Sequence, residues 1–146
     1  MPHADISPAG KEDLPALAVL WEASVRATHS FLTEEDIAFF RSFVVNDYLP
    51  SALLYCIRKN GIPRAFTSVR NKEIETLFVH PDARGKGYGK QLLEFAVRNF
   101  GANRVDVNEQ NTQAVGFYEH MGFTVIGRDE TDGYGKPFPI LHMERK

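Results

Sequence analysis

The chain has 146 residues, which is the size of one domain spanning 1–146 and leaves no room for a second. Hydrophobic residues make up 43% and charged residues 25%, values that exclude disordered and fibrous classes. The net charge of −2 argues against nucleic-acid binding, since general nucleic-acid binders are usually basic. No apolar run reaches about 18 residues and no secretion signal is visible, so we expect no membrane partner and a cytoplasmic location.

The single cysteine, Cys56, cannot form an internal disulfide, and the alternating residues around it predict a buried position in a strand. This is consistent with a reducing compartment. His80, His120 and His142 show no metal-ligand spacing with carboxylates or with Cys56, so we predict no metal.

The first half of the chain predicts helices followed by strands. A short strand is possible at 4–8, and apolar residues at three- and four-residue steps predict a helix over 13–28, with its first residue, an aspartate, as the cap. Thr33 followed by Asp36 predicts a capping box for a second helix, which we expect Pro50 to stop. Three strands then form an antiparallel meander: 53–59, 63–69 and 73–79.

The second half alternates helices with strands. We expect a helix that Gly101 ends, a strand over 104–108 that lies parallel to the strand at 73–79, and a helix between Asn111 and Gly122. Two last strands are predicted: 123–127 and 139–144. The sum is an α/β (α+β) domain of three layers, in which a mixed sheet of about six or seven strands carries helices on both faces.

A glycine-rich loop lies between the strand at 73–79 and the next helix. It holds three glycines and three basic residues: Gly85, Gly87, Gly89, Arg84, Lys86 and Lys90. Glycines let a ligand approach the backbone closely, and the helix start adds unpaired N–H donors and the positive end of a dipole. The loop therefore favours a diphosphate, although a glycine-rich turn with solvated lysines is the alternative.

The spacing of the loop narrows the type of diphosphate. A dinucleotide fingerprint needs glycine where Lys90 or Leu92 stands, and a Walker A loop needs Ser or Thr where Gln91 stands. The pattern Arg84-x-x-Gly87-x-Gly89 after a Leu-Phe-Val strand instead resembles the coenzyme A pyrophosphate loop of the GNAT superfamily of acetyl-CoA-dependent N-acyltransferases.

A second segment carries the same resemblance. The run from Asn111 to Phe123 matches every fixed letter of the superfamily pattern N-x-x-A-x-x-F-Y-x-x-x-G-F. The two segments stand in the expected order and separation, which makes the pair far more specific than either alone. On these residues the chain is identified as a small, single-domain, bacterial-type member of the superfamily.

The resemblance implies that the strands ending at Val79 and Asn108 splay apart, and that the pantetheine of acetyl-CoA lies between them. It implies that the loop holds the pyrophosphate, and that Asn111 makes a polar contact to the cofactor arm. The implied cofactor-binding residues are Leu77, Phe78, Val79, Arg84, Gly85, Lys86, Gly87, Tyr88, Gly89, Lys90, Asn111 and Tyr118.

Tyr118 matches the family position that protonates the departing thiolate. A phenol pKa near 10 lies above that of a thiol, so it can donate at neutral pH; the alternative is a tyrosine that only packs. An acceptor ammonium has no lone pair, so a base is expected. Glu73 and Glu75 alternate with Leu77 and Val79 on one strand face. We favour Glu75 as the base over Glu73, with His29 as a further candidate.

We expect the acceptor to contact the segment between the first two helices and the loop at 134–138. The candidate substrate-binding residues are Thr28, His29, Phe31 and Leu32. The aromatic-rich segment at 31–48 suggests a covered pocket, hence a small-molecule primary amine. Direct transfer in a ternary complex follows because Cys56 lies outside the motifs. The alternatives are a protein or peptide acetylase and a coenzyme-A-binding sensor without turnover; a homodimer is possible.

Overall fold

The computed structural model describes residues 5–146. The strands are β1 (Ile6–Pro8), β2 (Leu54–Lys59), β3 (Ile62–Arg70), β4 (Glu73–Val79), β5 (Arg104–Asn108), β6 (Thr124–Asp129) and β7 (Ile140–Glu144). The α-helices are α1 (Leu14–Thr28), α2 (Glu34–Phe43), α3 (Leu49–Ser51), α4 (Tyr88–Phe100) and α5 (Thr112–His120). Three further turns are the 3₁₀ segments η1 (Lys11–Asp13) and η3 (Pro81–Ala83) and the π turn η2 (Val44–Tyr48). Of the strand predicted at 4–8, residue 4 lies outside the described residues.

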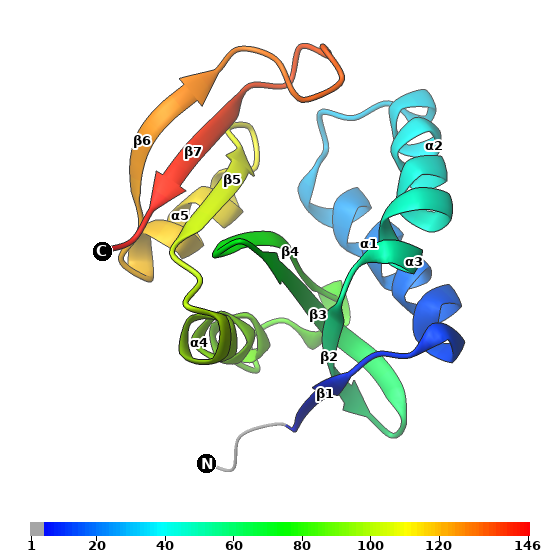
Figure 1. The fold of residues 1–146 in the computed structure, drawn as a ribbon. Helices are drawn as coiled ribbons and strands as arrows, with labels where there is room; N and C mark the ends of the chain where they lie inside the picture. Colours follow the sequence, from blue (N-terminus) through cyan, green and yellow to red (C-terminus); the bar gives the residue numbers. More distant parts are fainter. Residues whose placement is uncertain (1–4) are drawn as a thin grey trace.

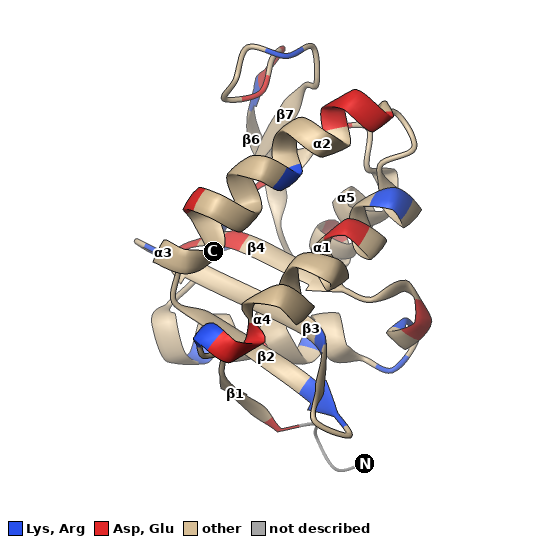
Figure 2. Cartoon of the chain, turned by 90° about the vertical axis from the view of Figure 1, so that its right-hand side faces the viewer, with Lys and Arg blue, Asp and Glu red and all other residues tan. Residues whose placement is uncertain are grey.

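The seven strands form one sheet in the order β1-β2-β3-β4-β5-β7-β6, and only β4 and β5 run parallel. Helices α1 and α2 cover one face of the sheet, and α4 and α5 cover the other (Figures 1 and 2). Side-chain alternation in β2 explains both layers, because Cys56 packs with α1 while its neighbour Ile57 packs with Leu92 of α4. The three-layer mixed fold predicted from the sequence is therefore confirmed, as is the burial of Cys56.

The helix caps agree with the prediction at Thr33 but not at Asp13. Thr33 accepts a hydrogen bond from the Asp36 amide, and the Asp36 carboxylate accepts one from the Thr33 amide. Asp13 makes no cap bond to α1; its carboxylate accepts from the Gly10 amide at 2.8 Å and pairs with Arg58 at 2.6 Å. The carboxylate therefore pairs with Arg58 of β2 instead of capping α1.

The sequence predicted that Pro50 would stop the second helical segment, but the segment continues one residue past it. The chain continues from α2 through the π turn into α3, where Pro50 occupies the first turn and Ser51 is the last residue. A proline is tolerated in a first turn because its missing N–H has no partner there.

Strands β4 and β5 pair only at Glu73–Arg104 and Ile74–Val105 and then separate, which confirms the predicted splay. A β-bulge in β4 lies just beyond this point: Ser68 pairs with Thr76 and the next residue of β3 pairs with Ile74, so Glu75 is the extra residue. The predicted alternation of Glu73 and Glu75 with Leu77 is therefore wrong. Ile74 and Leu77 both pack on the α4–α5 side, whereas Glu75 faces Tyr48 on the α2 side.

No helix in the described part of the chain is both long enough and apolar enough to cross a bilayer.

Candidate active site

A cavity of about 340 Å³ opens where β4 and β5 separate. It is walled by the end of β4, the glycine loop, the start of α5 and the end of α1. The lining residues from β4 and the loop are Leu77, Phe78, Val79, Ala83, Arg84, Gly85, Gly87, Tyr88, Gly89 and Lys90. Those from the helices are Ser24, Thr28, His29, Asn111, Gln113, Ala114, Phe117 and Tyr118. Every predicted cofactor residue except Lys86 thus lies on one cavity.

The glycine loop presents backbone amides to this cavity. Gly85 and Gly87 have φ near +79° and +78°, a conformation that costs other residues energy. The first helical hydrogen bond of α4 runs from the Gln91 amide to the Gly87 carbonyl, and the cap residue, Gly87, has no side chain that could occupy the amides. The amide donors of residues 88–90 are consequently available to an anion, which the helix dipole also favours.

Asn111 is oriented by the helix that it caps. Its Oδ1 accepts a hydrogen bond from the Ala114 amide at 3.2 Å, as the sequence predicted. The residue is only 9% exposed, and it lines the cavity. Because its oxygen is engaged in the cap, its side-chain NH₂ group is left to donate to a carbonyl in the cavity.

Tyr118 lies at the inner end of the cavity with 6% of its surface exposed. Its ring packs against Phe117 and Phe123, with centroid distances of 5.1 and 5.5 Å. Among the described residues its hydroxyl finds no hydrogen-bond partner, and burial raises the pKa of the phenol. The hydroxyl is therefore protonated at neutral pH and free to donate to a ligand.

A chain of hydrogen-bonded hydroxyl groups leads to Glu75. The sequence predicted Glu75 as a candidate base but did not predict this network. The Tyr48 hydroxyl lies 3.4 Å from Glu75 Oε1 and also bonds Ser68, whose Oγ is 2.7 Å from Thr76 Oγ1. If Tyr48 donates to the carboxylate, Ser68 donates to Tyr48 and Thr76 to Ser68, so each hydroxyl donates once. Burial raises the pKa of Tyr48 and keeps it a donor.

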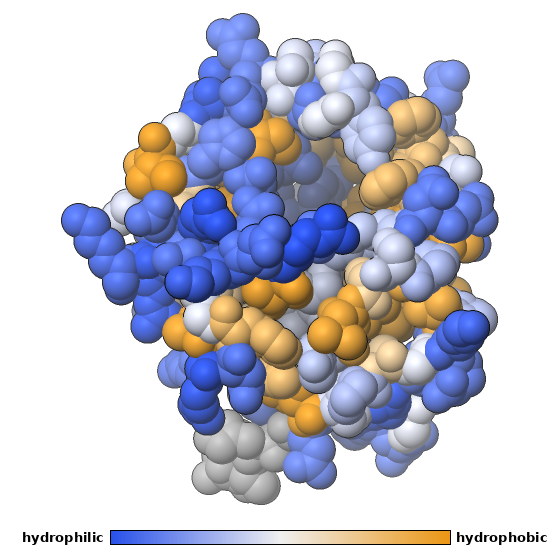
Figure 3. Space-filling view, viewed as in Figure 1, coloured by the Kyte–Doolittle hydropathy of each residue, from blue (hydrophilic) through white to orange (hydrophobic). Residues whose placement is uncertain are grey.

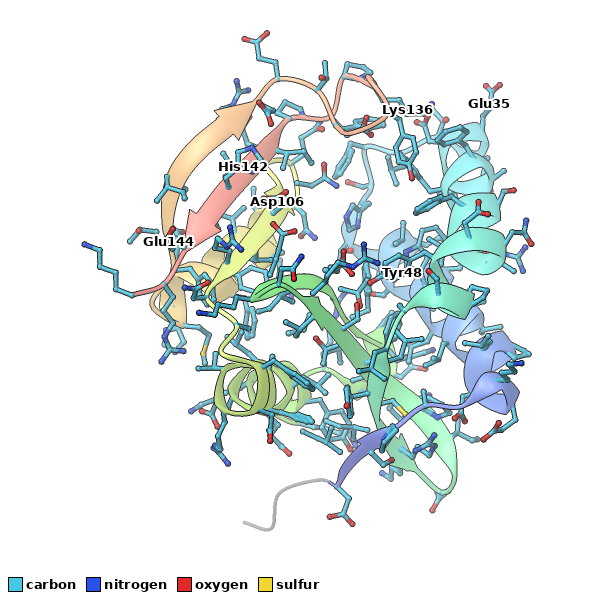
Figure 4. The ribbon with its side chains drawn as sticks, viewed as in Figure 1. Glu35, Tyr48, Asp106, Lys136, His142 and Glu144 are labelled. Carbon is cyan, nitrogen blue, oxygen red and sulfur yellow. The ribbon has the colours of Figure 1, made fainter. Side chains whose placement is uncertain are left out.

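This network depends on two irregular backbone segments. The bulge turns Glu75 toward α2, and the π turn carries Tyr48 beside β4 (Figure 4). The Glu75 side chain is 24% exposed, and Arg70 lies 3.7 Å from it. A substrate can reach this carboxylate. The sequence placed Tyr48 on the apolar face of the second helix but gave no sign of its position beside Glu75, because a π turn shifts every later side chain around the helix axis.

His29 is neutral and fixed as one tautomer. The Thr28 hydroxyl donates to the Ser24 carbonyl at 2.8 Å, so it accepts from His29 Nδ1 at 2.7 Å and leaves Nε2 with a lone pair. Burial lowers the pKa of His29 to about 4. His29 is therefore a weak base, and its Nε2 is better suited to accept a hydrogen bond than to take up a proton.

The other predicted acceptor residues lie outside the cavity. Leu32 packs against the α1 core, and Phe31 contacts both His29 and Phe138 at ring distances of 5.3 and 5.5 Å. Neither Glu73 nor Glu75 is among the residues that line the cavity. Burial, together with the nearby Asp106 carboxylate, raises the pKa of Glu73.

The loop between β6 and β7 is tied to α2. Lys136 pairs with Asp36 at 3.3 Å and lies 4.7 Å from the centre of the Phe39 ring, while Phe138 contacts Phe40. On the same side of the molecule, a hollow lies between β5 and the segment joining α1 to α2 (Figure 3).

His142 bridges two carboxylates beside this hollow. Its Nδ1 lies 2.6 Å from Asp106 and its Nε2 lies 2.8 Å from Asp129, and both carboxylates raise the pKa of the imidazole. Figure 4 shows Asp106 and His142 together on β5 and β7. No group of three His, Cys, Asp or Glu residues within 5–146 has a geometry that could hold a metal ion.

The splayed strands, the glycine loop at the start of α4 and the free tyrosine hydroxyl define the class of protein. A family model described as an acetyltransferase (GNAT) domain matches residues 50–125. The chain belongs to the GNAT family, and it is an N-acetyltransferase.

Particular relatives agree with this assignment. The peptidyl-lysine N-acetyltransferase YjaB of Salmonella typhimurium is 42% identical over 133 residues, covering 90% of this chain and 91% of that protein. The solution structure of the apo form of YjaB from Escherichia coli superposes with a TM-score of 0.90 at 37% identity, covering 98% and 97% of the two chains. The PaiA N-acetyltransferase of Thermoplasma acidophilum in complex with coenzyme A gives a TM-score of 0.74 at 22% identity, covering 99% of this chain and all of that one.

Proposed function

We propose that this chain transfers the acetyl group of acetyl-CoA to the ε-amine of a lysine in a protein or peptide. The observation that carries the proposal is the cavity at the splay, which brings the loop amides and the unpartnered Tyr118 hydroxyl onto one space. The lysine acceptor is favoured by YjaB, a relative named for that substrate. This favours the protein acetylase over the small-molecule enzyme that the sequence alone suggested.

The residues divide the reaction between two sides of β4. The loop amides hold the pyrophosphate, and the unpaired edge of β4 near Leu77 and Val79 hydrogen-bonds the pantetheine amides. The neutral amine attacks the thioester carbonyl carbon, and the C–S bond breaks as the new C–N bond completes. Tyr118 donates a hydrogen bond or its proton to the departing sulfur.

Glu75 serves as the base on the other side. A lysine ε-ammonium must lose a proton before attack, which costs about 4 kcal/mol at neutral pH. Glu75 lies at the bulge, two residues before Leu77, and its side chain is 24% exposed, so an acceptor can reach it. We propose that Glu75 accepts the proton of the ammonium, directly or through a water molecule. The Tyr48 hydroxyl holds the carboxylate in place.

Two matched peptides test the acceptor. One carries a blocked N-terminus and a single lysine; the other carries a free N-terminus with arginine in place of that lysine. Each is incubated with acetyl-CoA beside a panel of free amino acids and polyamines, with thiol release and mass spectrometry as readouts. We expect acetylation on the lysine ε-nitrogen. Transfer only to the free amino acids or polyamines would establish a small-molecule enzyme. Binding of acetyl-CoA with no transfer to any amine would contradict turnover.

A further inference from the structure

A second cavity, of about 290 Å³, lies on the outer side of the glycine loop. It is lined by Lys59, Asn60, Ile62, Arg64, Asp82, Ala83, Lys86 and Tyr88. It shares Ala83 and Tyr88 with the active-site cavity, so the two spaces are neighbours separated by the loop. The second cavity also takes in Lys86, the one predicted cofactor residue that the first leaves out.

Three elements contribute a cation to this second cavity. Lys59 ends β2, Lys86 comes from the loop, and Arg64 stands at a β-bulge in β3. Ile57 pairs with Ala65, and the next residue of β2 pairs with Pro63, which leaves Arg64 as the extra residue. A bulge re-aims the side chain that it inserts, and it also tolerates a proline, which cannot donate to the ladder. Figure 2 shows blue residues at this hairpin.

The three cations have no anionic partner within the described chain. None of them forms an ion pair there, and the one carboxylate on the cavity wall, Asp82, lies 3.8 Å from His80 instead. Lys59 and Arg64 lower the pKa of Lys86 by repulsion. Three like charges held together without a counter-charge cost free energy, which a bound anion would recover.

We propose that the second cavity, with Lys59, Arg64 and Lys86, binds a phosphate monoester. Two sources share this chemistry: the 3′-phosphate of the coenzyme A whose pyrophosphate lies on the adjacent loop, and a separate phosphate or nucleotide. The first source rests on the proposed function, because it requires coenzyme A at the neighbouring cavity. A phosphate dianion matches three converging donors better than a carboxylate does, since it offers more acceptor oxygens.

Calorimetric titration with coenzyme A and with dephospho-coenzyme A separates the sources. The native protein is compared with a Lys59→Ala, Arg64→Ala double variant, which leaves the glycine loop untouched. The matched control is a Lys11→Ala, Arg98→Ala double variant, which removes the same charge from exposed positions away from the loop. ADP and inorganic phosphate are titrated separately into the native protein and into both variants. Melting curves establish that every variant is folded.

If the 3′-phosphate is the ligand, the native protein and the control bind coenzyme A about tenfold more tightly than dephospho-coenzyme A, and the double variant loses this preference. If a separate phosphate is the ligand, both coenzymes bind equally, and inorganic phosphate binds the native protein and the control but not the double variant, whereas ADP still binds the double variant through the glycine loop. The proposal is overturned if the coenzymes bind equally and inorganic phosphate does not bind, or if the double variant keeps the native preference for coenzyme A. Failure of coenzyme A itself to bind would overturn the proposed function, while the phosphate titration would still decide this site.

Discussion

Replacing Tyr118 with phenylalanine removes one hydroxyl group and changes little else. The hydroxyl has no protein partner among the described residues, and the ring keeps its contacts with Phe117 and Phe123 at 5.1 and 5.5 Å. We therefore expect the free energy of unfolding to change by less than about 1 kcal/mol. The loss of the proton donor should lower kcat by about 10²- to 10³-fold, equivalent to about 3–4 kcal/mol of transition-state stabilisation.

The assay is steady-state thiol release with the best lysine peptide, together with a calorimetric Kd for acetyl-CoA and a chemical denaturation curve. Tyr55→Phe is the matched control, because Tyr55 stacks on Phe95 and Phe100 at 5.0 and 5.4 Å, outside the cavity. It should leave kcat unchanged. A Tyr118→Phe enzyme whose kcat stays within threefold of the native value would refute the assignment of Tyr118 as the proton donor.

Three further predictions concern the base, the loop and the pH dependence of stability. Glu75→Gln should lower kcat/KM about 10²-fold and Tyr48→Phe about tenfold, and the double variant should be no worse than Glu75→Gln; additive losses would separate the two residues. Gly87→Ala forces a side chain to φ near +78° and should cost about 1–2 kcal/mol of stability, whereas Gly89→Ala only brings a Cβ to 3.6 Å from Phe117; equal melting temperatures would contradict this. His29 has a pKa of about 4 in the folded protein, so the unfolded chain binds this proton more readily. The free energy of unfolding should therefore fall by up to about 3 kcal/mol as the pH drops from 6.5 to 4. His29→Gln should remove this loss, and a variant with the same pH dependence as the native protein in denaturation experiments would contradict the prediction.

Regular periodicity gave most of the fold. Strand β4 and strand β5 were predicted at their observed bounds, because alternating residues with clear turn signals specify such strands locally. The errors at Asp13 and Pro50 have a common origin. Both depend on structure that the local sequence pattern does not show. The Asp13 carboxylate pairs with Arg58 of the sheet, and Pro50 lies in the first turn of α3, which follows the π turn.

The candidate site divides in the same way. The glycine loop and Asn111 could be found from the sequence because their spacing is itself the structural requirement. Glu75 could be named but not oriented, since the bulge that turns it is a property of the pairing between β3 and β4. Tyr48 and Arg64 were missed because a π turn and a second bulge determine where they point.

The central claim is that acetyl-CoA lies at the splay, between the edge of β4 and the glycine loop. The most direct measurement follows backbone amide resonances during a titration of the native protein with acetyl-CoA. The account predicts that the largest shifts fall on residues 84–90 and 77–79, with a further shift at Asn111. Shifts concentrated on other elements, or none at all in a folded protein, would contradict it.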